Sequence, residues 1–493
     1  MSQFTPSKYQ VAIYDFIRSG SGNAVINAVA GSGKSTTLVN ALRLIPENQS
    51  VLFLAFNKSI VEELKIKVGP LPNVTIRTLH SLGASALMKQ LHTDTDKEKY
   101  KVWVNTGVKF GNIAPTITLE PEEVEEYKSN IRKLIDLMRV NLSESVADGA
   151  ELAWKHGLNL YDNEPEIAWK AIQWGKGDVT TIDFTDMIYL PNIMRIRMPR
   201  YDWVLIDECQ DLNAAQRGMF LKCIKDGGRF IAVGDPQQAI YGFAGADVLS
   251  FNLLKALPNT VELPLSVCYR CDADIIKRAQ TIVPQIEARD GAPSGEINEK
   301  AKMAEIQDGD MILCRNTAPL TALCMKYIAS GVKAYIKGKD IGTNLIGMLE
   351  KTRRTNIREA LTVLNKELEK IASKVAQKER CDLAEARQST QYETYYDKIQ
   401  ALEVLSEGLS QTRQLVGRIE EIFSDESRKG IVLSTIHKAK GLEADRVFIA
   451  CPDKLYNRRA MQIAWMAEQE RNLVYVAYTR AKHYLGFIAD FSA

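Results

Sequence analysis

The chain has 493 residues, of which 45% are hydrophobic and 25% are charged, and this composition excludes a mostly disordered protein. A chain of this length exceeds what one hydrophobic core supports, so we expect about three domains. The net charge of +2 excludes a strongly basic nucleic-acid-binding domain, so any polyanion must be held by local patches.

Neither a targeting segment nor a membrane span is visible in the sequence. The start, MSQFTPSKYQ, lacks a basic region followed by an apolar one, and no run approaches the roughly 18 apolar residues of a membrane helix. We therefore expect a cytoplasmic protein without a membrane partner. The eight cysteines are scattered, with Cys268 and Cys271 as the one close pair, which favours reduced, packed thiols over a structural metal site.

Short β-branched runs separated by helical patterns organise the first part of the chain. Buried parallel strands are predicted at 23–29, 50–56, 202–208 and 229–235. Helical patterns lie between them at 35–44, 58–68 and 213–224. This alternation predicts an α/β lobe built on a doubly wound parallel sheet. Further strand-like runs at 310–316, 332–338, 430–437 and 445–451 predict a second α/β lobe.

Two helical stretches interrupt this rhythm. The first, at about 86–180, is expected to pack Trp154, Trp169 and Trp174 into a small core of its own. The second, at about 346–427, is predicted to form an antiparallel helical hairpin. Its apolar seam combines residues at spacings of three and four with a partner set, namely Leu361, Leu364, Leu368, Ile371 and Val375 against Ile399, Leu402, Leu405 and Leu409.

The segment AVAGSGKS, at 28–35, has the composition of a phosphate-binding loop. It follows a predicted strand and precedes a predicted helix, so glycine amides and the helix N-terminus face an anion. Lys34 then reaches the β and γ phosphates of a nucleotide, and the Ser35 hydroxyl binds Mg²⁺. An ordinary glycine turn is the alternative, but the lysine and the hydroxyl stand at the spacing that the phosphate loop requires.

The strand WVLIDE ends in two adjacent carboxylates. Two acids at a buried strand tip repel each other unless a cation or a substrate lies beside them. We expect Asp207 to hold Mg²⁺ through water and Glu208 to accept a proton from the attacking water. A solvated helix start is the alternative interpretation of such a pair.

Four further blocks resemble motifs II, III, V and VI of superfamily 1 DNA helicases of the UvrD/Rep type. They are IDECQDLNAAQ (206–216), VGDPQQAIYGFAGA (233–246), STIHKAKGLEADRVF (434–448) and ERNLVYVAYTRAK (470–482). The segments AFNKS (55–59), TLHSLG (78–83), DFTDMI (183–188) and LSVCYR (265–270) are similar to other family motifs. The resemblance spans both lobes but not the two helical stretches.

This resemblance implies two tandem RecA-like P-loop NTPase domains, each with a mainly helical insertion. The first domain would comprise 1–85 and 181–257, with its insertion at 86–180. The second would comprise 258–345 and 428–493, with an insertion at 346–427 that is much shorter than is usual in the family.

The resemblance also implies roles for individual residues around ATP. Gln10 would read the adenine edge, Tyr269 would stack on the base, and Glu443 would hold the ribose. Arg270 and Arg480 would reach the γ phosphate across a cleft between the lobes, and Gln238 would sense the same group. Surface ion pairing is the alternative for the two arginines. The phosphate loop itself would contribute Ala30, Gly31, Ser32, Gly33, Lys34, Ser35 and Thr36.

Aromatic, hydroxyl and amide side chains in the motifs suggest a single-stranded DNA surface. Aromatic faces stack unpaired bases without sequence preference and without high global charge. The candidate residues are Phe56, Asn57, Thr78, His80, Tyr241, Phe243, Thr435 and His437. Burial in the core is the alternative for the aromatics. Phe243 and Ala244 stand where the family usually has Trp and Arg, so DNA coupling there is expected to differ.

Two basic clusters could face nucleic acid or simply be solvated. They are Arg195, Arg197 and Arg200, and Lys351, Arg353, Arg354 and Arg358.

The resemblance implies an ATP-dependent translocase that moves 3′→5′ on single-stranded DNA and unwinds duplex ahead of it. Two alternatives stay open: a DNA-stimulated ATPase that remodels nucleoprotein or serves a nuclease partner without unwinding, and a nucleotide-gated module unrelated to nucleic acid. We expect a monomer on DNA, with a nuclease or a replication or repair factor as a possible protein partner.

Overall fold

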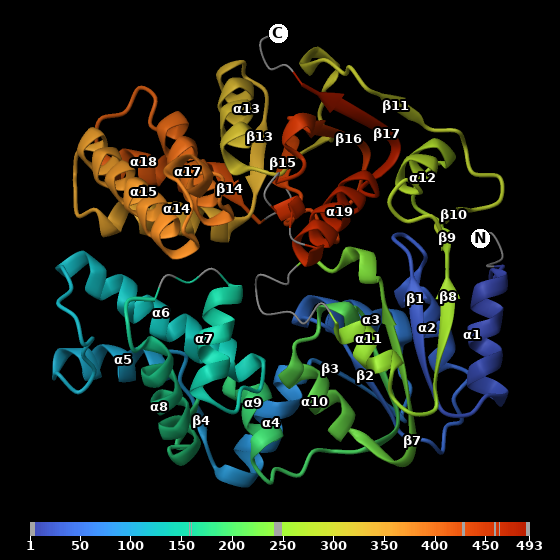
Figure 1. Ribbon diagram of the computed structural model, residues 1–493. Helices are drawn as coiled ribbons and strands as arrows, with labels where there is room; N and C mark the ends of the chain where they lie inside the picture. The colour runs from blue at the N-terminus through green and yellow to red at the C-terminus, as the bar shows by residue number, and fades with distance from the viewer. Residues whose placement is uncertain are drawn as a thin grey trace. The chain divides into compact units, whose positions relative to one another are not determined.

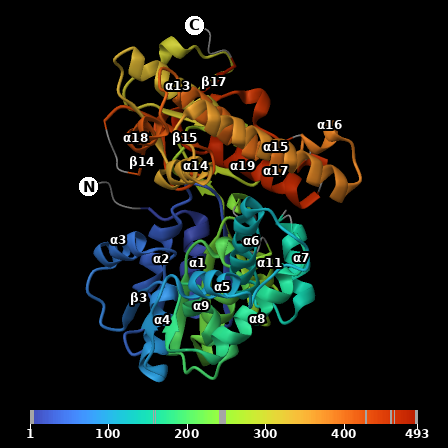
Figure 2. The same ribbon diagram turned by 90° about the vertical axis from the view of Figure 1, so that its left-hand side faces the viewer.

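The computed structural model describes residues 5–156, 158, 160–240, 249–425, 429–457, 460–462 and 464–489. The chain separates into two compact units, Met1–Ser266 and Val267–Ala493 (Figures 1 and 2). Within the described residues, no helix has the length and apolar character needed to cross a membrane.

The first unit is built on a parallel sheet with the strand order β3-β2-β6-β7-β1-β8. All of its strand pairs are parallel, so the carboxyl ends of its strands meet at one edge. The strands are β1 (Asn23–Ala28), β2 (Val51–Leu54), β3 (Val74–Arg77), β6 (Tyr201–Ile206), β7 (Ile224–Gly234) and β8 (Thr260–Leu265). This sheet confirms the predicted α/β class.

Helices cover both faces of the first sheet because successive strand residues point to opposite sides. Ile26 joins one core with α1, α2 and α3, whereas its neighbour Val25 joins the other core with α4, α9, α10 and α11. The helices are α1 (Lys8–Ser19), α2 (Lys34–Leu42), α3 (Lys58–Val68), α4 (Leu79–Leu91), α9 (Asp186–Ile193), α10 (Ala214–Lys222) and α11 (Ser250–Lys255).

The first unit extends beyond the predicted boundary at residue 257. Strand β8 pairs in parallel with β1 from Asn23↔Thr260 to Ala28↔Leu265, so it belongs to the first sheet. The prediction was wrong at this strand because β8 lies at the sheet edge, where most of its side chains are exposed or half-buried and Pro264 is tolerated.

A helical region with its own core follows α4. It contains α5 (Lys99–Lys109), α6 (Pro121–Val140), α7 (Val146–Lys155) and α8 (Glu164–Gly177), and is tied off by the short strands β4 (Asp94–Thr95) and β5 (Thr181–Ile182). Trp169 and Trp174 pack on this core as predicted. Trp154 does not: it is 71% exposed, because α7 buries the face that carries Gly149 and Ala153.

A buried ion network ties this helical region to the start of α9. The fully buried guanidinium of Arg139, on α6, donates to both carboxylate oxygens of Asp183 at 2.7 and 2.8 Å and to Asp186 at 2.8 Å. The Lys99 ammonium lies 3.0 Å from the other oxygen of Asp186. Opposite charges therefore compensate one another within the buried cluster.

The second unit is built on another wholly parallel sheet, with the order β11-β17-β16-β12-β15-β13-β14. Its strands are β11 (Glu296–Asn298), β12 (Met311–Cys314), β13 (Ala334–Lys337), β14 (Phe423–Ser424), β15 (Ile431–Thr435), β16 (Ala444–Ala450) and β17 (Ala481–Ile488). Its flanking helices are α12 (Ala273–Ala279), α13 (Thr317–Ala329) and α19 (Ala464–Tyr478), and the short pair β9 (Val267–Cys268) and β10 (Glu287–Ala288) precedes β11.

The second helical region contains α14 (Lys339–Lys351), α15 (Ile357–Glu379), α16 (Leu383–Ala386), α17 (Thr390–Leu405) and α18 (Thr412–Ile422). Helix α17 runs back along α15, since Glu369 accepts hydrogen bonds from both Arg387 and Tyr392. Leu364 and Leu402 share one continuous core with Leu320 of α13 and with the sheet. These helices are therefore part of the second unit's main core.

Candidate nucleotide site and nucleic-acid interface

The loop between β1 and α2 has the backbone geometry of a phosphate cradle. Gly31 and Gly33 adopt left-handed conformations, with φ of 65° and 77°, which glycine reaches without steric cost. Helix α2 begins at Lys34, and no side chain caps its N-terminus. The first backbone N–H groups of the helix can therefore donate to a ligand in the loop. The Ser32 hydroxyl is buried and has no hydrogen-bond partner in the described part of the chain. These donors fit a bound phosphate.

Lys34 and Ser35 meet the two carboxylates at the end of β6. The Lys34 ammonium lies 2.9 Å from Glu208, and the Ser35 hydroxyl donates to Asp207 at 2.9 Å. Burial alone would lower the pKa of Lys34, but Glu208, Asp207 and Asp235 outweigh it and raise that pKa above its ordinary value. The structure thus brings the predicted lysine, hydroxyl and both acids together.

Asp207 is buried beside a second carboxylate. Its burial, together with the charge of Glu208, raises the pKa of Asp207 to about 6 even though Lys34 and Ser35 act in the opposite direction. A divalent cation would stabilise the buried Asp207 carboxylate, and the Ser35 hydroxyl beside it offers a second oxygen ligand. The donor set therefore fits Mg²⁺, which Ser35 and Asp207 would hold.

Glu208 is fixed by its backbone and by a neighbouring amide. Its φ and ψ of 54° and 42° are left-handed, a conformation that non-glycine residues rarely adopt and that is common at functional sites. The Gln210 amide donates to Glu208 at 2.8 Å and accepts the backbone N–H of Asp235 at 3.0 Å. Asp235 in turn accepts a hydrogen bond from Gln238 at 2.5 Å. Gln210, which sequence reasoning did not single out, therefore links the ends of β6 and β7.

Gln10 lies against the phosphate loop. Its side chain forms a capping box with Ser7 at the start of α1, and its amide donates to the Thr37 hydroxyl of α2 at 3.0 Å. Only 1% of Gln10 is exposed. The structure places this residue beside the loop, whereas its reading of adenine stays a prediction.

Arg270, Glu443 and Arg480 gather in the second unit. Arg270 lies 2.6 Å from Glu443 and donates to the carbonyl of Thr479 at 3.2 Å. Arg480 is 1% exposed and donates to the carbonyls of Val476 and Leu442 at 2.9 and 3.1 Å. Ion pairing thus holds for Arg270, but Arg480 is not a surface residue.

Two further features surround this cluster. Burial would raise the pKa of Glu443, but Arg270 and Lys482 hold it below its ordinary value, so this acid is ionised at neutral pH. The Tyr269 side chain, next to Arg270 in the chain, is 39% exposed and so offers a ring face. Cys268 and Cys271, on either side, are buried free thiols.

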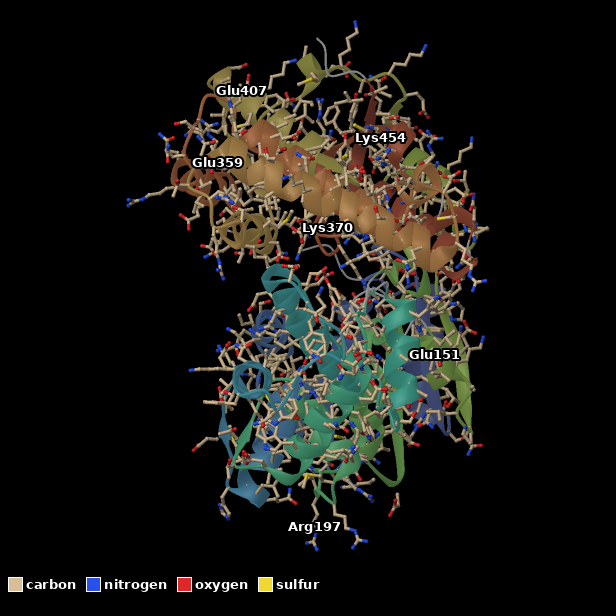
Figure 3. All side chains as sticks on the ribbon, turned by 60° about the vertical axis from the view of Figure 1, so that its left-hand side comes forward. Glu151, Arg197, Glu359, Lys370, Glu407 and Lys454 are labelled. Carbon is tan, nitrogen blue, oxygen red and sulfur yellow. The ribbon has the colours of Figure 1, made fainter. Side chains whose placement is uncertain are left out.

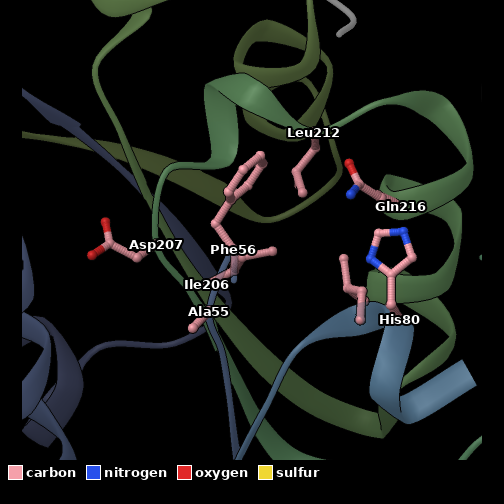
Figure 4. Close-up of a pocket in the computed structure, with 8 residues that line it drawn as sticks. Ala55, Phe56, His80, Ile206, Asp207, Leu212 and Gln216 are labelled. Atoms are coloured by element: carbon pink, nitrogen blue, oxygen red, sulfur yellow. The ribbon is translucent and has the colours of Figure 1, made fainter. Parts of the chain in front are cut away.

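Two predicted DNA residues, Phe56 and His80, line a pocket on the first unit (Figure 4). Phe56 is half exposed at one side, and His80 forms the other side. Thr78 caps α4 by accepting the N–H of Ser81. Asn57 similarly caps α3 by accepting the N–H of Ile60. The Asn57 and Thr78 side chains therefore cap helices, and the rings of Phe56 and His80 are the groups available for stacking.

Sequence reasoning missed the ring of Phe184, which lies in the segment DFTDMI. Its plane is stacked on His80, with ring centroids 3.9 Å apart and an angle of 14° between the planes. Phe184 is 61% exposed, so its outer face is open. Burial lowers the pKa of His80 to about 4, which keeps the imidazole neutral at physiological pH. In the sequence, Phe184 lies between Asp183 and Asp186, the two acids that pair with Arg139. An aromatic residue between two acids is the one feature of the sequence that could have drawn attention to it.

The remaining DNA candidates fall in two groups. Thr435 ends β15 and is buried, and the neighbouring His437 has its pKa lowered to about 4 by burial and by the charges of Arg315 and Lys438. Tyr241 and Phe243 lie outside the described residues.

Family models match most of the chain. The UvrD/REP helicase N-terminal domain matches residues 12–258, and the UvrD-like helicase C-terminal domain matches residues 347–490. The chain belongs to the UvrD-like helicase family. This confirms the resemblance drawn from the motifs. Neither model covers residues 259–346, which include Tyr269 and Arg270.

Relatives of this UvrD-like family member are distant. The chain is 25% identical to F-box DNA helicase 1 of Gallus gallus, over 93% of its own length and 46% of that protein. It is 22% identical to DNA helicase II of Escherichia coli, over 59% of its length and 44% of that protein. A third relative is the ATP-dependent DNA helicase PcrA of Staphylococcus aureus, at 23% identity, with 54% and 38% of the two chains covered. The chain thus spans about half the length of the curated relatives it matches.

Proposed function

We propose that this protein hydrolyses ATP with Mg²⁺ and uses the energy to move 3′→5′ along single-stranded DNA, separating duplex ahead of it. Two contacts, Lys34–Glu208 and Ser35–Asp207, support ATP hydrolysis. They bring together a lysine suited to phosphate, two oxygen ligands suited to Mg²⁺ and an acid suited to act as a base. Membership of the UvrD-like helicase family supports the DNA part. The direction of movement rests on the resemblance to UvrD/Rep helicases.

In the chemical step, the side chains of the first unit exchange partners. The Lys34 ammonium lies 2.9 Å from Glu208 and neutralises its charge. When the β and γ phosphates draw Lys34 toward the loop, Glu208 loses this partner and becomes free to accept a proton from the attacking water. Mg²⁺ held by Ser35 and Asp207 would supply positive charge to the phosphates. Gln210 holds the Glu208 carboxylate in position during the exchange.

Arg270 and Arg480 are proposed to contribute positive charge to the γ phosphate. Their planar forks suit phosphate oxygens, and an arginine in this role contributes about 10³ to 10⁵ in rate. Arg270 would exchange Glu443 for phosphate, which leaves the ionised Glu443 available for the ribose. Both arginines belong to the second unit, whereas the phosphate loop belongs to the first.

Single-stranded DNA is proposed to stack on the aromatic faces of the first unit. Phe56 and the Phe184–His80 pair offer such faces, and each stacked base contributes about 1 to 3 kcal/mol. Tyr241, Phe243, Thr435 and His437 are proposed to extend the path. We also propose that the protein is cytoplasmic, acts as a monomer on DNA, and serves a nuclease or a replication or repair factor.

A second candidate function is a DNA-stimulated ATPase without unwinding activity. One observation favours it: the helices α15 and α17 are embedded in the core of the second unit instead of forming a separate domain that could grip duplex independently. Both candidates predict ATP hydrolysis, and they differ only in strand separation.

Steady-state ATP hydrolysis should be measured with and without oligo(dT), followed by strand displacement on duplexes with 3′ and 5′ tails. Strong stimulation with displacement of the 3′-tailed duplex alone is expected. Stimulation without displacement would establish the second candidate. Hydrolysis that is indifferent to DNA would refute both and favour a nucleotide-gated module.

A further inference from the structure

Two buried thiols flank the residues of the second unit that are proposed to contact ATP. Cys268 ends the short strand β9, Cys271 lies just before α12, and Tyr269 and Arg270 stand between them. Both cysteines are free thiols with no exposed surface. A Cys-x-x-Cys spacing is typical of thiols that are oxidised as a pair. Here the two positions inside the pair are ones to which we assign a role in the nucleotide site.

The two sulfurs face each other across this turn. The backbone N–H of Cys271 donates to the Cys268 sulfur at 3.5 Å. The Cys271 thiol also donates to the Cys268 sulfur, and this hydrogen bond lowers the pKa of Cys268 although burial acts in the opposite direction. Cys268 therefore has more thiolate character than an ordinary buried cysteine, and the thiolate is the form that oxidants attack.

Neighbouring groups hold the backbone of the turn in this conformation. Strand β9 pairs with β10 through Cys268↔Ala288. The Arg289 guanidinium donates to the carbonyls of Tyr269 and Cys271 at 3.1 and 3.3 Å. Cysteines whose side chains already meet can be bridged without a displacement of the backbone. The turn is thus prepared for a disulfide in the conformation that the structure shows.

The same conformation keeps Arg270 in its ion pair. Arg270 lies 2.6 Å from Glu443 and donates to the carbonyl of Thr479 at 3.2 Å. That carbonyl also lies 3.7 Å from the Cys271 sulfur, so Arg270 and Cys271 share an acceptor. To reach a phosphate, Arg270 has to leave Glu443. A turn closed into a disulfide ring has restricted torsion angles, which oppose this movement.

We propose that Cys268 and Cys271 form a reversible disulfide that holds Arg270 on Glu443 and thereby slows ATP hydrolysis. The effect on hydrolysis rests on the proposed function, because it acts through the role given there to Arg270. In a reducing compartment the pair stays as thiols until an oxidant is present, which is the behaviour of a redox sensor.

Hydrogen peroxide is the oxidant in the proposed step. The Cys268 thiolate attacks one peroxide oxygen, the O–O bond breaks, and a sulfenic acid and hydroxide are formed. The Cys271 sulfur then attacks the Cys268 sulfur, the S–S bond forms, and the sulfenic oxygen leaves as water with the Cys271 proton. The two thiols lose two electrons and two protons, and the peroxide becomes two molecules of water. Dithiothreitol reverses the step by thiol–disulfide exchange and is itself oxidised.

A second pair of thiols has to be separated from the first in any test. Cys314, at the end of β12, is hydrogen-bonded to Cys451, which follows β16. Lys454, labelled in Figure 3, marks this part of the second unit, and its N–H donates to the carbonyl of Cys451 at 2.9 Å. Cys381 is the one cysteine of the eight that is not buried. No residue proposed to contact ATP stands next to any of these three in the sequence.

The test compares the full wild-type chain with a variant carrying Cys268→Ser and Cys271→Ser. Serine keeps a hydrogen-bond donor and acceptor at each position but cannot form a disulfide. Both proteins are treated with hydrogen peroxide, free thiols are alkylated, and disulfide-linked peptides are mapped by mass spectrometry without reduction. We expect wild type to yield the Cys268–Cys271 disulfide.

ATP hydrolysis is measured on the same samples before oxidation, after oxidation and after dithiothreitol. The wild-type rate should fall at least about tenfold on oxidation, because an arginine at the γ phosphate contributes about 10³ to 10⁵ in rate. Dithiothreitol should restore it. The rate of the double-serine variant should not respond to peroxide. Cys381→Ser is the matched control: it removes the most accessible thiol and should respond as wild type does. If the double variant fails to fold, Cys271→Ala alone should abolish both the disulfide and the response.

Four results would overturn the proposal. They are a wild type without a disulfide, a disulfide mapped only to Cys314 and Cys451, a Cys268–Cys271 disulfide with an unchanged rate, and a loss of rate that persists in the double-serine variant. A reduced wild type that does not hydrolyse ATP would refute the proposed function and the effect on hydrolysis with it. The disulfide is mapped without reference to activity, so the two failures are distinguishable.

Discussion

The ammonium of Lys34 lies 2.9 Å from the carboxylate of Glu208, so the lysine proposed to bind phosphate and the acid proposed to act as base neutralise each other. The pair spans the start of α2 and the end of β6, two elements far apart in sequence that the parallel sheet places at one edge. In the proposed mechanism, a nucleotide that attracts the lysine would also free the base, and this would link substrate binding to activation of the attacking water.

Lys34→Ala should abolish ATP turnover while leaving nucleotide-free binding of oligo(dT) nearly unchanged. The loop would lose the charge that meets the β and γ phosphates, whereas the aromatic DNA surface would keep its residues. Steady-state hydrolysis and fluorescence anisotropy with oligo(dT) check this. Loss of the folded state, seen by circular dichroism, would instead give Lys34 a mainly structural role.

Glu208→Gln should retain ATP binding but lower the rate of hydrolysis by roughly 10²- to 10⁴-fold, the contribution of a general base. The amide keeps the shape of the side chain and cannot accept the proton of water. Fluorescent-nucleotide binding and single-turnover hydrolysis separate the two steps. A rate close to wild type would assign the proton acceptor elsewhere.

Phe184→Ala should weaken oligo(dT) binding by about 1 to 3 kcal/mol, because one stacking face is lost. The slope of log K against log salt should stay the same, since stacking releases few counterions. Phe110→Ala is the matched control, as this ring is 67% exposed in the first helical region. A large change in slope would reveal a lost phosphate contact in place of stacking.

Arg139→Met should lower the free energy of unfolding of the first unit by about 3 to 5 kcal/mol, because Asp183 and Asp186 would be left buried without their shared cation. Arg200→Met is the control: its pair with Asp226 is exposed, so losing it should leave the free energy of unfolding nearly unchanged. Urea unfolding measures both. Equal effects would show that the buried network adds nothing beyond a surface pair.

His80 should make stability fall as the pH decreases from about 6.5 to about 4. Burial lowers the pKa of His80 in the folded state to about 4, so over this range the unfolded chain binds the proton and the folded chain does not. Proton uptake therefore favours unfolding as pH falls, and the full contribution is present above about 6.5. His80→Gln should flatten this part of the stability profile.

The phosphate loop and the acids of β6 were predictable because their chemistry depends on local spacing. Strand β1, the loop and helix α2 are consecutive, and Asp207 and Glu208 end an apolar strand, so a few residues carry the whole signal. The unit boundary was not predictable in the same way. Strand β8 is an exposed edge strand with a proline, and only its pairing with β1 identifies it.

Contacts between distant segments account for the other differences. In the sequence nothing distinguishes Gln210 from other polar residues. Its role becomes visible only in the fold, where β6 and β7 lie side by side and its amide joins Glu208 to Asp235. The stack of Phe184 on His80 likewise joins segments a hundred residues apart. Trp154 looked like a core residue by type, but the phase of α7 decides its exposure, and short helices leave that phase weakly determined.

Leu320, Leu402 and Leu364 belong to one continuous apolar core, so the second helical region is packed rigidly against its sheet. Close-packed interiors transmit displacement with little compression. A force on the outer end of α15 would therefore displace the strands, because no hinge separates this helix from the sheet. Deleting residues 357–405 would accordingly expose the apolar side chains that now pack against these helices. The second unit should then be insoluble.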